Sequence, residues 1–189
     1  MRTPRNPWPA LLGAVLITVA GPRAAGAGQA RPFDARDGED LAREAAAAWA
    51  DDARLVWIES DEAVDGTGSA PRWGYLFYSD ERDAGRVYSV RNGRIVLAAE
   101  PAFDFPAPPL ADGWIDSARA LAAAEADGGL RYRTDHQGHV RSMLLVRGLL
   151  DPEKPDATTW AVVYDSASAS GLWIVIDAHT GKVVKTWRG

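Results

Sequence analysis

The sequence has no cysteine among its 189 residues and only three histidines. Without thiols there is no disulfide framework and no cysteine for lipid attachment, so stability in an oxidising compartment has to come from a packed core. Neither a phosphate-binding loop nor a GxGxxG fingerprint occurs. The sequence therefore indicates no cofactor, and a disulfide scaffold is excluded.

Long hydrophobic runs are also missing. The longest covers residues 10–20, behind Arg2 and Arg5 and ahead of the small residues 25–27. This run is too short for a membrane span, which takes about 20 apolar residues. The pattern predicts a secretory signal peptide over residues 1–27, with an uncleaved anchor as the alternative. We expect export to the periplasm or the extracellular space, with no membrane association after cleavage.

Positive charge is in short supply. The chain has 21 basic and 26 acidic residues, and the loss of residues 1–27 would remove three arginines and no acid. The remaining 18 basic against 26 acidic residues give a net charge of about minus eight. Such a chain lacks the basic footprint of proteins that bind nucleic acid or anionic membranes.

Short β-branched and aromatic runs separated by turn residues predict antiparallel strands. In the C-terminal part they are residues 160–164, 172–177 and 182–187, with a turn at 179–181. In the first half they are residues 54–60, 73–78, 86–90 and 95–98, with an Asn92-Gly93 hairpin turn. Residues 130–134 are predicted as a further strand that pairs with residues 140–149.

One amphipathic helix is predicted before each group of strands. The first is capped by Asp37 or Asp40 and precedes residue 51. The second is capped by Asp112 or Asp116, and Gly128-Gly129 is expected to end it.

Three landmarks recur at nearly constant spacing and indicate an internal repeat. Trp73 and Trp160, Gly85 and Gly171, and Gly93 and Gly181 are separated by 87, 86 and 88 positions. The predicted class is α+β, with two tandem units of a helix plus an antiparallel meander. The expected boundaries are a flexible lead-in at 28–36, a first unit at 37–100, a Pro-rich linker at 101–111 and a second unit at 112–189.

The stretch V-I-D-A-H-T-G-K-V-V at 175–184, with the preceding V-V-Y at 162–164, resembles the second half of a PepSY domain. The resemblance extends over about 75 residues, from residue 114 to the C-terminus. It implies a helix followed by a small antiparallel sheet that ends in a D-A-x-T-G-x-V signature. It also implies a role in restraining a secreted peptidase. The first copy has Val-Arg-Asn-Gly at 90–93 in place of the signature, and so departs from the family pattern.

Aromatic residues are the best candidates for binding, because Trp and Tyr are the usual anchors of protein interfaces. The candidates are Trp73, Tyr75, Phe77, Trp160, Tyr164 and Trp173. Burial in the core is the alternative for these residues, since buried aromatics dominate small cores. The two-sided apolar pattern of residues 73–78 predicts more hydrophobic surface than one helix can cover.

Catalytic candidates are few. Asp135, His136 and His139 are the one grouping with any similarity to a metal site, although a turn residue, Gly138, interrupts it. The serines at 166, 168 and 170 lack a nucleophile-elbow motif. We therefore expect an exported non-catalytic module that binds a peptide or protein, with a secreted peptidase as the partner that the PepSY resemblance implies. The alternatives are a small metal-dependent enzyme that uses the 135–139 grouping, and a structural homodimer.

Overall fold

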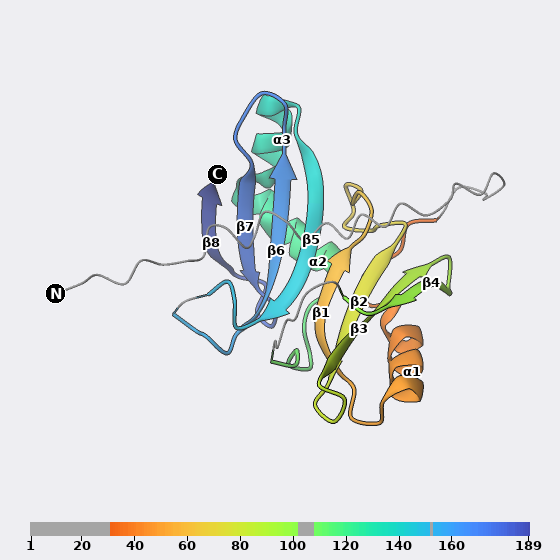
Figure 1. Cartoon of the computed structure of the whole chain (residues 1–189). Coiled ribbons are helices and arrows are strands. Elements are labelled where there is room, and N and C mark those ends of the chain that lie inside the picture. Colours follow the sequence, from red (N-terminus) through yellow and green to blue (C-terminus); the bar gives the residue numbers. More distant parts are fainter. Residues whose placement is uncertain (1–30, 102–107, 152) are drawn as a thin grey trace.

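The structure, a computed structural model, describes residues 31–101, 108–151 and 153–189. It contains one eight-stranded antiparallel sheet with the strand order β4-β3-β2-β1-β5-β6-β7-β8 (Figure 1). The elements in chain order are α1 (Glu39–Trp49), β1 (Arg54–Ser60), β2 (Trp73–Ser79), β3 (Ala84–Arg91), β4 (Arg94–Ala99), α2 (Ser117–Ala124), the kinked segment η2 (Glu125–Gly129), α3 (Leu130–His136), β5 (His139–Arg147), β6 (Thr158–Asp165), β7 (Leu172–Asp177) and β8 (Val183–Arg188). The mixed helix-and-sheet class expected from the sequence is therefore observed.

The sheet consists of two four-stranded meanders that meet at β1 and β5. These two strands pair antiparallel, with Trp57 opposite Val146 and Glu59 opposite Leu144. Each meander follows helical segments, so the element order of the first half recurs in the second. The result is a single continuous sheet, larger than one helix-plus-meander unit.

The outermost strand pair of each half has the same irregularity. The ladder between β3 and β4 skips Val96, and the ladder between β7 and β8 skips Val184. These two valines are 88 positions apart, as are Gly93 and Gly181 in the preceding turns. Both glycines have positive φ, at 65° and 73°, a conformation that other residues adopt only with strain. The two halves thus match in detail as well as in element order.

The described helices all contribute to one core, on one face of the sheet. Ala42 and Ala46 from α1 and Leu121 from α2 pack with the strand residues of both halves. In Figure 1, α2 and α3 lie behind β5–β8. The small alanine side chains allow the helices to lie close to the sheet, and this explains why α1 and α2 are rich in alanine.

At the centre of this core the two halves touch through tryptophans. The Trp73 and Trp160 rings lie 6.2 Å apart in a T-shaped arrangement, and Trp114 contacts Trp160 in the same way at 5.9 Å. All three are at most 4% exposed. The core is therefore shared by both halves.

The prediction of a strand at residues 130–134 was wrong. The second helix does break at the predicted Gly128-Gly129 stop, since Gly128 has a non-helical φ of 146°. The chain then continues into a further helix, α3, and not into a strand. The helix is favoured by an i,i+4 contact between the Tyr132 and His136 rings, 5.1 Å apart. The Thr134 hydroxyl also donates to the Leu130 carbonyl at 2.9 Å. Tyr132 is the buried residue of α3, and it fixes this helix to the core.

Of the two predicted helix caps, one is confirmed and the other is wrong. Asp116 caps α2, accepting from the Ser117 amide at 2.7 Å, as expected. For α1, neither Asp37 nor Asp40 is the cap; Gly38 holds that position without a side-chain hydrogen bond. Residues 31–36 make fixed contacts and are not a loose lead-in, since Phe33 forms a β-bridge with Ala70. The predicted signal peptide and residues 102–107 of the linker lie outside the described residues.

Candidate functional site

The structure places the six predicted aromatic residues on two different faces. Five have at most 1% of their surface exposed, beneath the helices: Trp73, Tyr75, Phe77, Trp160 and Tyr164. Trp173 lies on the opposite face and is partly exposed. The five thus agree with the core alternative, and only Trp173 is available at the surface.

The buried aromatics hold the segments that lead into the helices. The Trp73 indole donates to the Phe33 carbonyl at 2.8 Å, and the Trp160 indole donates to the Ile115 carbonyl at 2.7 Å. The Tyr75 hydroxyl donates to the Ala35 carbonyl at 2.7 Å. A buried indole or phenol needs such a partner. These residues therefore fix where each helix starts.

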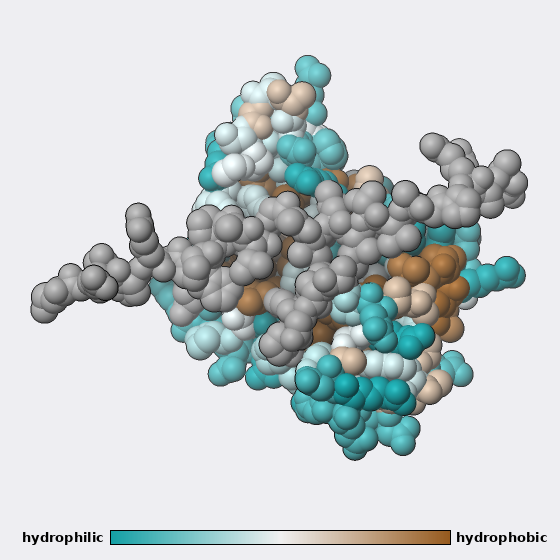
Figure 2. Space-filling view, in the orientation of Figure 1, coloured by the Kyte–Doolittle hydropathy of each residue, from teal (hydrophilic) through white to brown (hydrophobic). Residues whose placement is uncertain are grey.

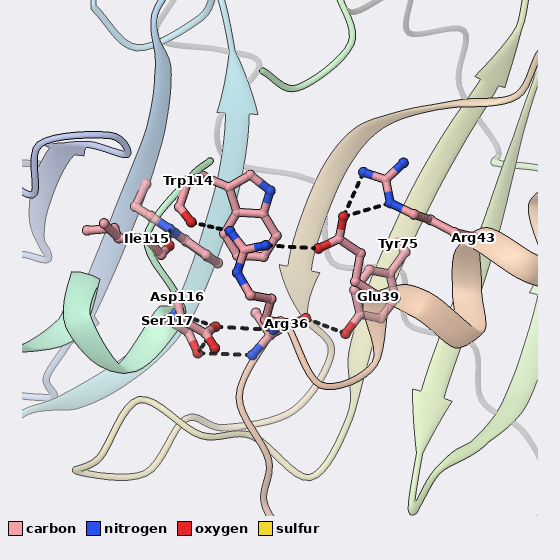
Figure 3. Close-up of polar contacts among 10 residues, drawn as sticks. Arg36, Glu39, Arg43, Tyr75, Trp114, Ile115, Asp116 and Ser117 are labelled. Carbon is pink, nitrogen blue, oxygen red and sulfur yellow. Dashed lines mark hydrogen bonds and ion pairs between the residues drawn. The ribbon is translucent and has the colours of Figure 1, made fainter. Parts of the chain in front are cut away.

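The N-termini of α1 and α2 meet in a polar cluster between the two halves (Figure 3). The Arg36 guanidinium lies 3.8 Å from the centre of the Trp114 ring, and it donates a hydrogen bond to the Trp114 carbonyl. It also lies 3.7 Å from the Glu39 carboxylate, which Arg43 approaches to 2.6 Å. Each of these charges is paired within the cluster.

The backbone completes the same junction. The Arg36 amide donates to Asp116 at 3.1 Å, and the Ala35 amide donates to the Ser117 hydroxyl at 3.0 Å. Burial raises the pKa of Asp116, although the amides of Ser117 and Arg36 favour its charged form. Because the donors and acceptors satisfy one another, this cluster is a joint between the two halves and not an open ligand site.

The other face of the sheet has no described helix in its apolar clusters, and we call it the helix-free face. Its buried apolar strand residues include Val56, Leu76, Val87, Leu144, Val146, Ala161 and Val175. Leu149 and Leu150, from the loop after β5, pack on part of it. Figure 2 shows the molecule in the orientation in which β5–β8 lie in front, with apolar residues gathered over β4.

Four aromatic residues on this face remain partly exposed: Trp57, Tyr78, Trp173 and Trp187. The Trp173 and Trp187 rings stack at 5.5 Å with 12° between their planes, and the Lys185 ammonium lies 5.2 Å from the Trp187 ring. Only Trp173 was among the predicted site residues. Strand alternation could have identified Tyr78, because it faces away from Tyr75 and Phe77. The pairing of neighbouring strands could have identified Trp187, because it lies directly opposite Trp173.

Two acids lie among these apolar groups, on the central strand β1 and just after it. Glu59 is opposite Gly74 in β2, and Asp61 approaches that glycine so closely that an added Cβ would be 2.7 Å from Oδ1. Burial and the neighbouring charge of Asp61 raise the pKa of Glu59 to about 8. Burial also raises the pKa of Asp61, opposed by a hydrogen bond from Ser89.

The sequence-based metal candidates do not converge. Asp135 and His136 lie in α3, whereas His139 begins β5. The His136 ring contacts Tyr132 and lies 3.4 Å from Arg188. Within the described ranges, no group of three or more His, Cys, Asp or Glu residues is placed to hold a metal ion.

The D-A-x-T-G stretch acts as a turn. The Asp177 carboxylate accepts from the amides of His179 and Thr180 at 3.0 and 2.9 Å, and from the Thr180 hydroxyl. Gly181 then supplies the positive φ that closes the turn into β8. The residues of this signature are thus explained by local backbone geometry.

No protein-family model matches the chain, and a comparison with curated proteins finds no match either. Among solved structures, the chain is similar to a crystal structure from Clostridium difficile 630 whose protein is described as a "putative lipoprotein". The identity is 14% and the TM-score 0.56, with 80% of this chain and 93% of the other covered. This similarity concerns the fold. None of the described helices is long and apolar enough to cross a membrane.

Proposed function

We propose that this protein is an exported, non-catalytic binding module that holds a peptide or protein partner on the helix-free face of its sheet. One observation carries the proposal: all the described helices pack on one face, while four partly exposed aromatic residues lie on the other. Aromatic anchors within an apolar surface are characteristic of protein recognition sites.

The face is a better docking site than either outer strand. An added strand needs a regular row of free amide and carbonyl groups. The ladders that hold β4 and β8 are interrupted at Val96 and Val184, and such bulges bend an edge strand and disrupt pairing. On β8, Lys185 and Arg188 add charge to the edge. A partner is therefore expected to lie across the strands.

We also propose that each half of the protein, a helix with four strands, is a PepSY-like unit. This proposal is supported by the recurring order of helix and four strands, by the matched interruptions at Val96 and Val184, and by the Asp177 turn. A secreted peptidase as the partner follows from that resemblance. Export rests on the predicted signal peptide.

The test uses immobilised residues 28–189 and the exported proteins of the source organism. A Trp173→Ala/Trp187→Ala variant removes the stacked pair from the helix-free face. The matched control is Leu130→Ala, since Leu130 is 56% exposed on α3 on the other side of the molecule. Captured proteins are identified by mass spectrometry, and a captured peptidase is then purified and assayed with and without the module.

The proposal expects a partner that the wild type and the Leu130 variant retain and the double variant loses, with peptidase activity falling as the module is added. All proteins should show the same thermal unfolding midpoint within a few degrees. A partner that the double variant retains at full affinity would move the binding site off this face. An unchanged peptidase rate would reject regulation of that enzyme.

A further inference from the structure

The centre of the helix-free face combines apolar side chains with one carboxyl group that has no cationic partner among the residues that the structure describes. Glu59 lies in β1, one of the two middle strands of the sheet, and it is partly exposed. Leu144 is its neighbour across the strand pair with β5. Trp57, two residues earlier on the same face, forms a hydrogen bond with it.

Neighbouring acids differ from Glu59 because their charges are compensated. Arg72 Nε lies 3.3 Å from Asp61 and 3.8 Å from Glu62, and Arg91 lies 3.2 Å from Glu62. The Ser89 hydroxyl donates to Asp61 at 2.5 Å. In the described part of the chain no ion pair joins Glu59 to a lysine, arginine or histidine.

The surroundings favour a cation of one kind. A basic side chain that enters here would meet the Glu59 carboxyl and the Trp57 ring together, and an aromatic face attracts a cation within about 6 Å. Two neighbouring side chains, Leu76 and Leu144, are apolar, so the aliphatic stem of the approaching side chain would pack against apolar groups. Charge complementarity inside an apolar surface then provides specificity.

We infer that the helix-free face recognises a protein partner through an arginine or lysine that projects from an apolar surface and pairs with Glu59 beside Trp57. This inference rests on the proposed function and names the chemistry of its partner. The raised pKa of Glu59 agrees with this inference. At neutral pH the carboxyl group of the free protein is mostly protonated, and a bound cation would stabilise its ionised form.

A phage-displayed library of random peptides provides the probe. The library is selected at pH 8.5 on wild-type protein, on Glu59→Gln and on the control Glu62→Gln, whose wild-type carboxylate is already paired with two arginines. Peptides are sequenced, synthesised and titrated against each protein. Every selected peptide is also titrated against Trp173→Ala/Trp187→Ala, which reports whether it binds the helix-free face.

The expected result is face-directed peptides enriched in arginine or lysine among apolar residues. Their affinity should fall at least about tenfold in Glu59→Gln, because the basic residue of the peptide would lose its partner in a desolvated site. It should stay within twofold in Glu62→Gln, because the Glu62 carboxylate is already paired with arginines of the protein. Below pH 8 the wild-type affinity should fall by up to about tenfold per pH unit, and Glu59→Gln should show no such dependence.

Two failures are distinguishable. Face-directed peptides without basic residues, bound equally by wild type and Glu59→Gln, would overturn the inference and leave the proposed function intact. Peptides whose affinity is unaffected by the Trp173 and Trp187 substitutions, or a library that yields no binder, would overturn both.

Discussion

At the scale of single residues, the role of each aromatic side chain depends on which face of its strand it occupies. Trp160 is fully buried and its indole N–H has a backbone acceptor, whereas Trp173 is partly exposed and stacks on Trp187. The two tryptophans, 13 positions apart, therefore have different structural roles. One positions a helix, and the other lies on the proposed binding surface.

Trp160→Ala is expected to lower the free energy of unfolding by about 3–5 kcal/mol, since it removes a large buried ring and leaves the Ile115 carbonyl without its donor. Trp173→Ala should cost clearly less. Urea denaturation of both variants measures the difference. Equal losses would show that the two rings are buried to the same extent in solution.

Glu59 gives the stability a defined pH dependence. Its pKa is raised from 4.5 in the unfolded chain to about 8 in the folded protein, chiefly by burial. Folding therefore favours the protonated form, and this contribution is fully present below pH 4.5 and is lost as pH rises through 8. The unfolding free energy of wild type relative to Glu59→Gln should fall across that window, by at most about 1.4 kcal/mol per pH unit.

Denaturant titrations at four or five pH values supply the measurement. Subtracting the Glu59→Gln curve removes most of the contribution of Asp61, Glu62 and the two arginines nearby. A difference that stays constant from pH 4.5 to 8 would mean that the carboxyl of Glu59 is well solvated.

At the scale of elements, the loop between β1 and β2 reaches across to the second half. Gly68, with φ of 92°, lies against the first turn of α2, where an added Cβ would be 2.6 Å from the Ala118 Cα. At Gly66, in the same loop, an added Cβ would meet, among the described residues, only the end of the Arg133 side chain at 4.0 Å. The loop thus contributes a close backbone contact between the halves, and that contact requires glycine at one position only.

Gly68→Ala should destabilise the protein by about 2–4 kcal/mol, because alanine would both strain the backbone and collide with the main chain of α2. The matched control Gly66→Ala should change stability by less than about 0.5 kcal/mol. Thermal and urea unfolding of the pair are compared. Similar effects of the two substitutions would indicate that the loop does not rest on α2.

At the scale of the whole molecule, the two halves form one folding unit in spite of their repeated architecture. They share the β1 and β5 ladder, the Trp73 and Trp160 contact, and the polar junction around Arg36. Each half alone would expose a central strand and half of a core. The linker between them therefore does not separate two independent domains.

Unfolding is accordingly expected to be a single cooperative transition. Trp73→Ala in the first half and Trp160→Ala in the second should each lower the stability of both halves. Amide hydrogen exchange in β2 and in β6 reports the two halves separately. If a variant accelerated the exchange of the slowest amides only in the half that carries the substitution, the two halves would unfold independently.

The sequence by itself determined what depends on neighbouring residues. The hairpin turn at Asn92-Gly93, the cap at Asp116, most strand positions and the repeat spacing were all predicted, because turn chemistry and strand alternation are local. It failed at residues 130–134, where a strand was expected after the break at Gly128 and a further helix, which packs near Tyr164, follows instead.

Tertiary structure alone decided which face each aromatic residue occupies and how the halves join. Periodicity shows that alternate residues of a strand share a face, yet it cannot say which face the helices cover. Only the fold placed Trp73 beneath the helices and Trp187 on the other side, and only the pairing of β1 with β5 brought Glu59 to the middle of an apolar surface. The candidate site is made of residues from different strands, and their neighbourhood exists only once the sheet has formed.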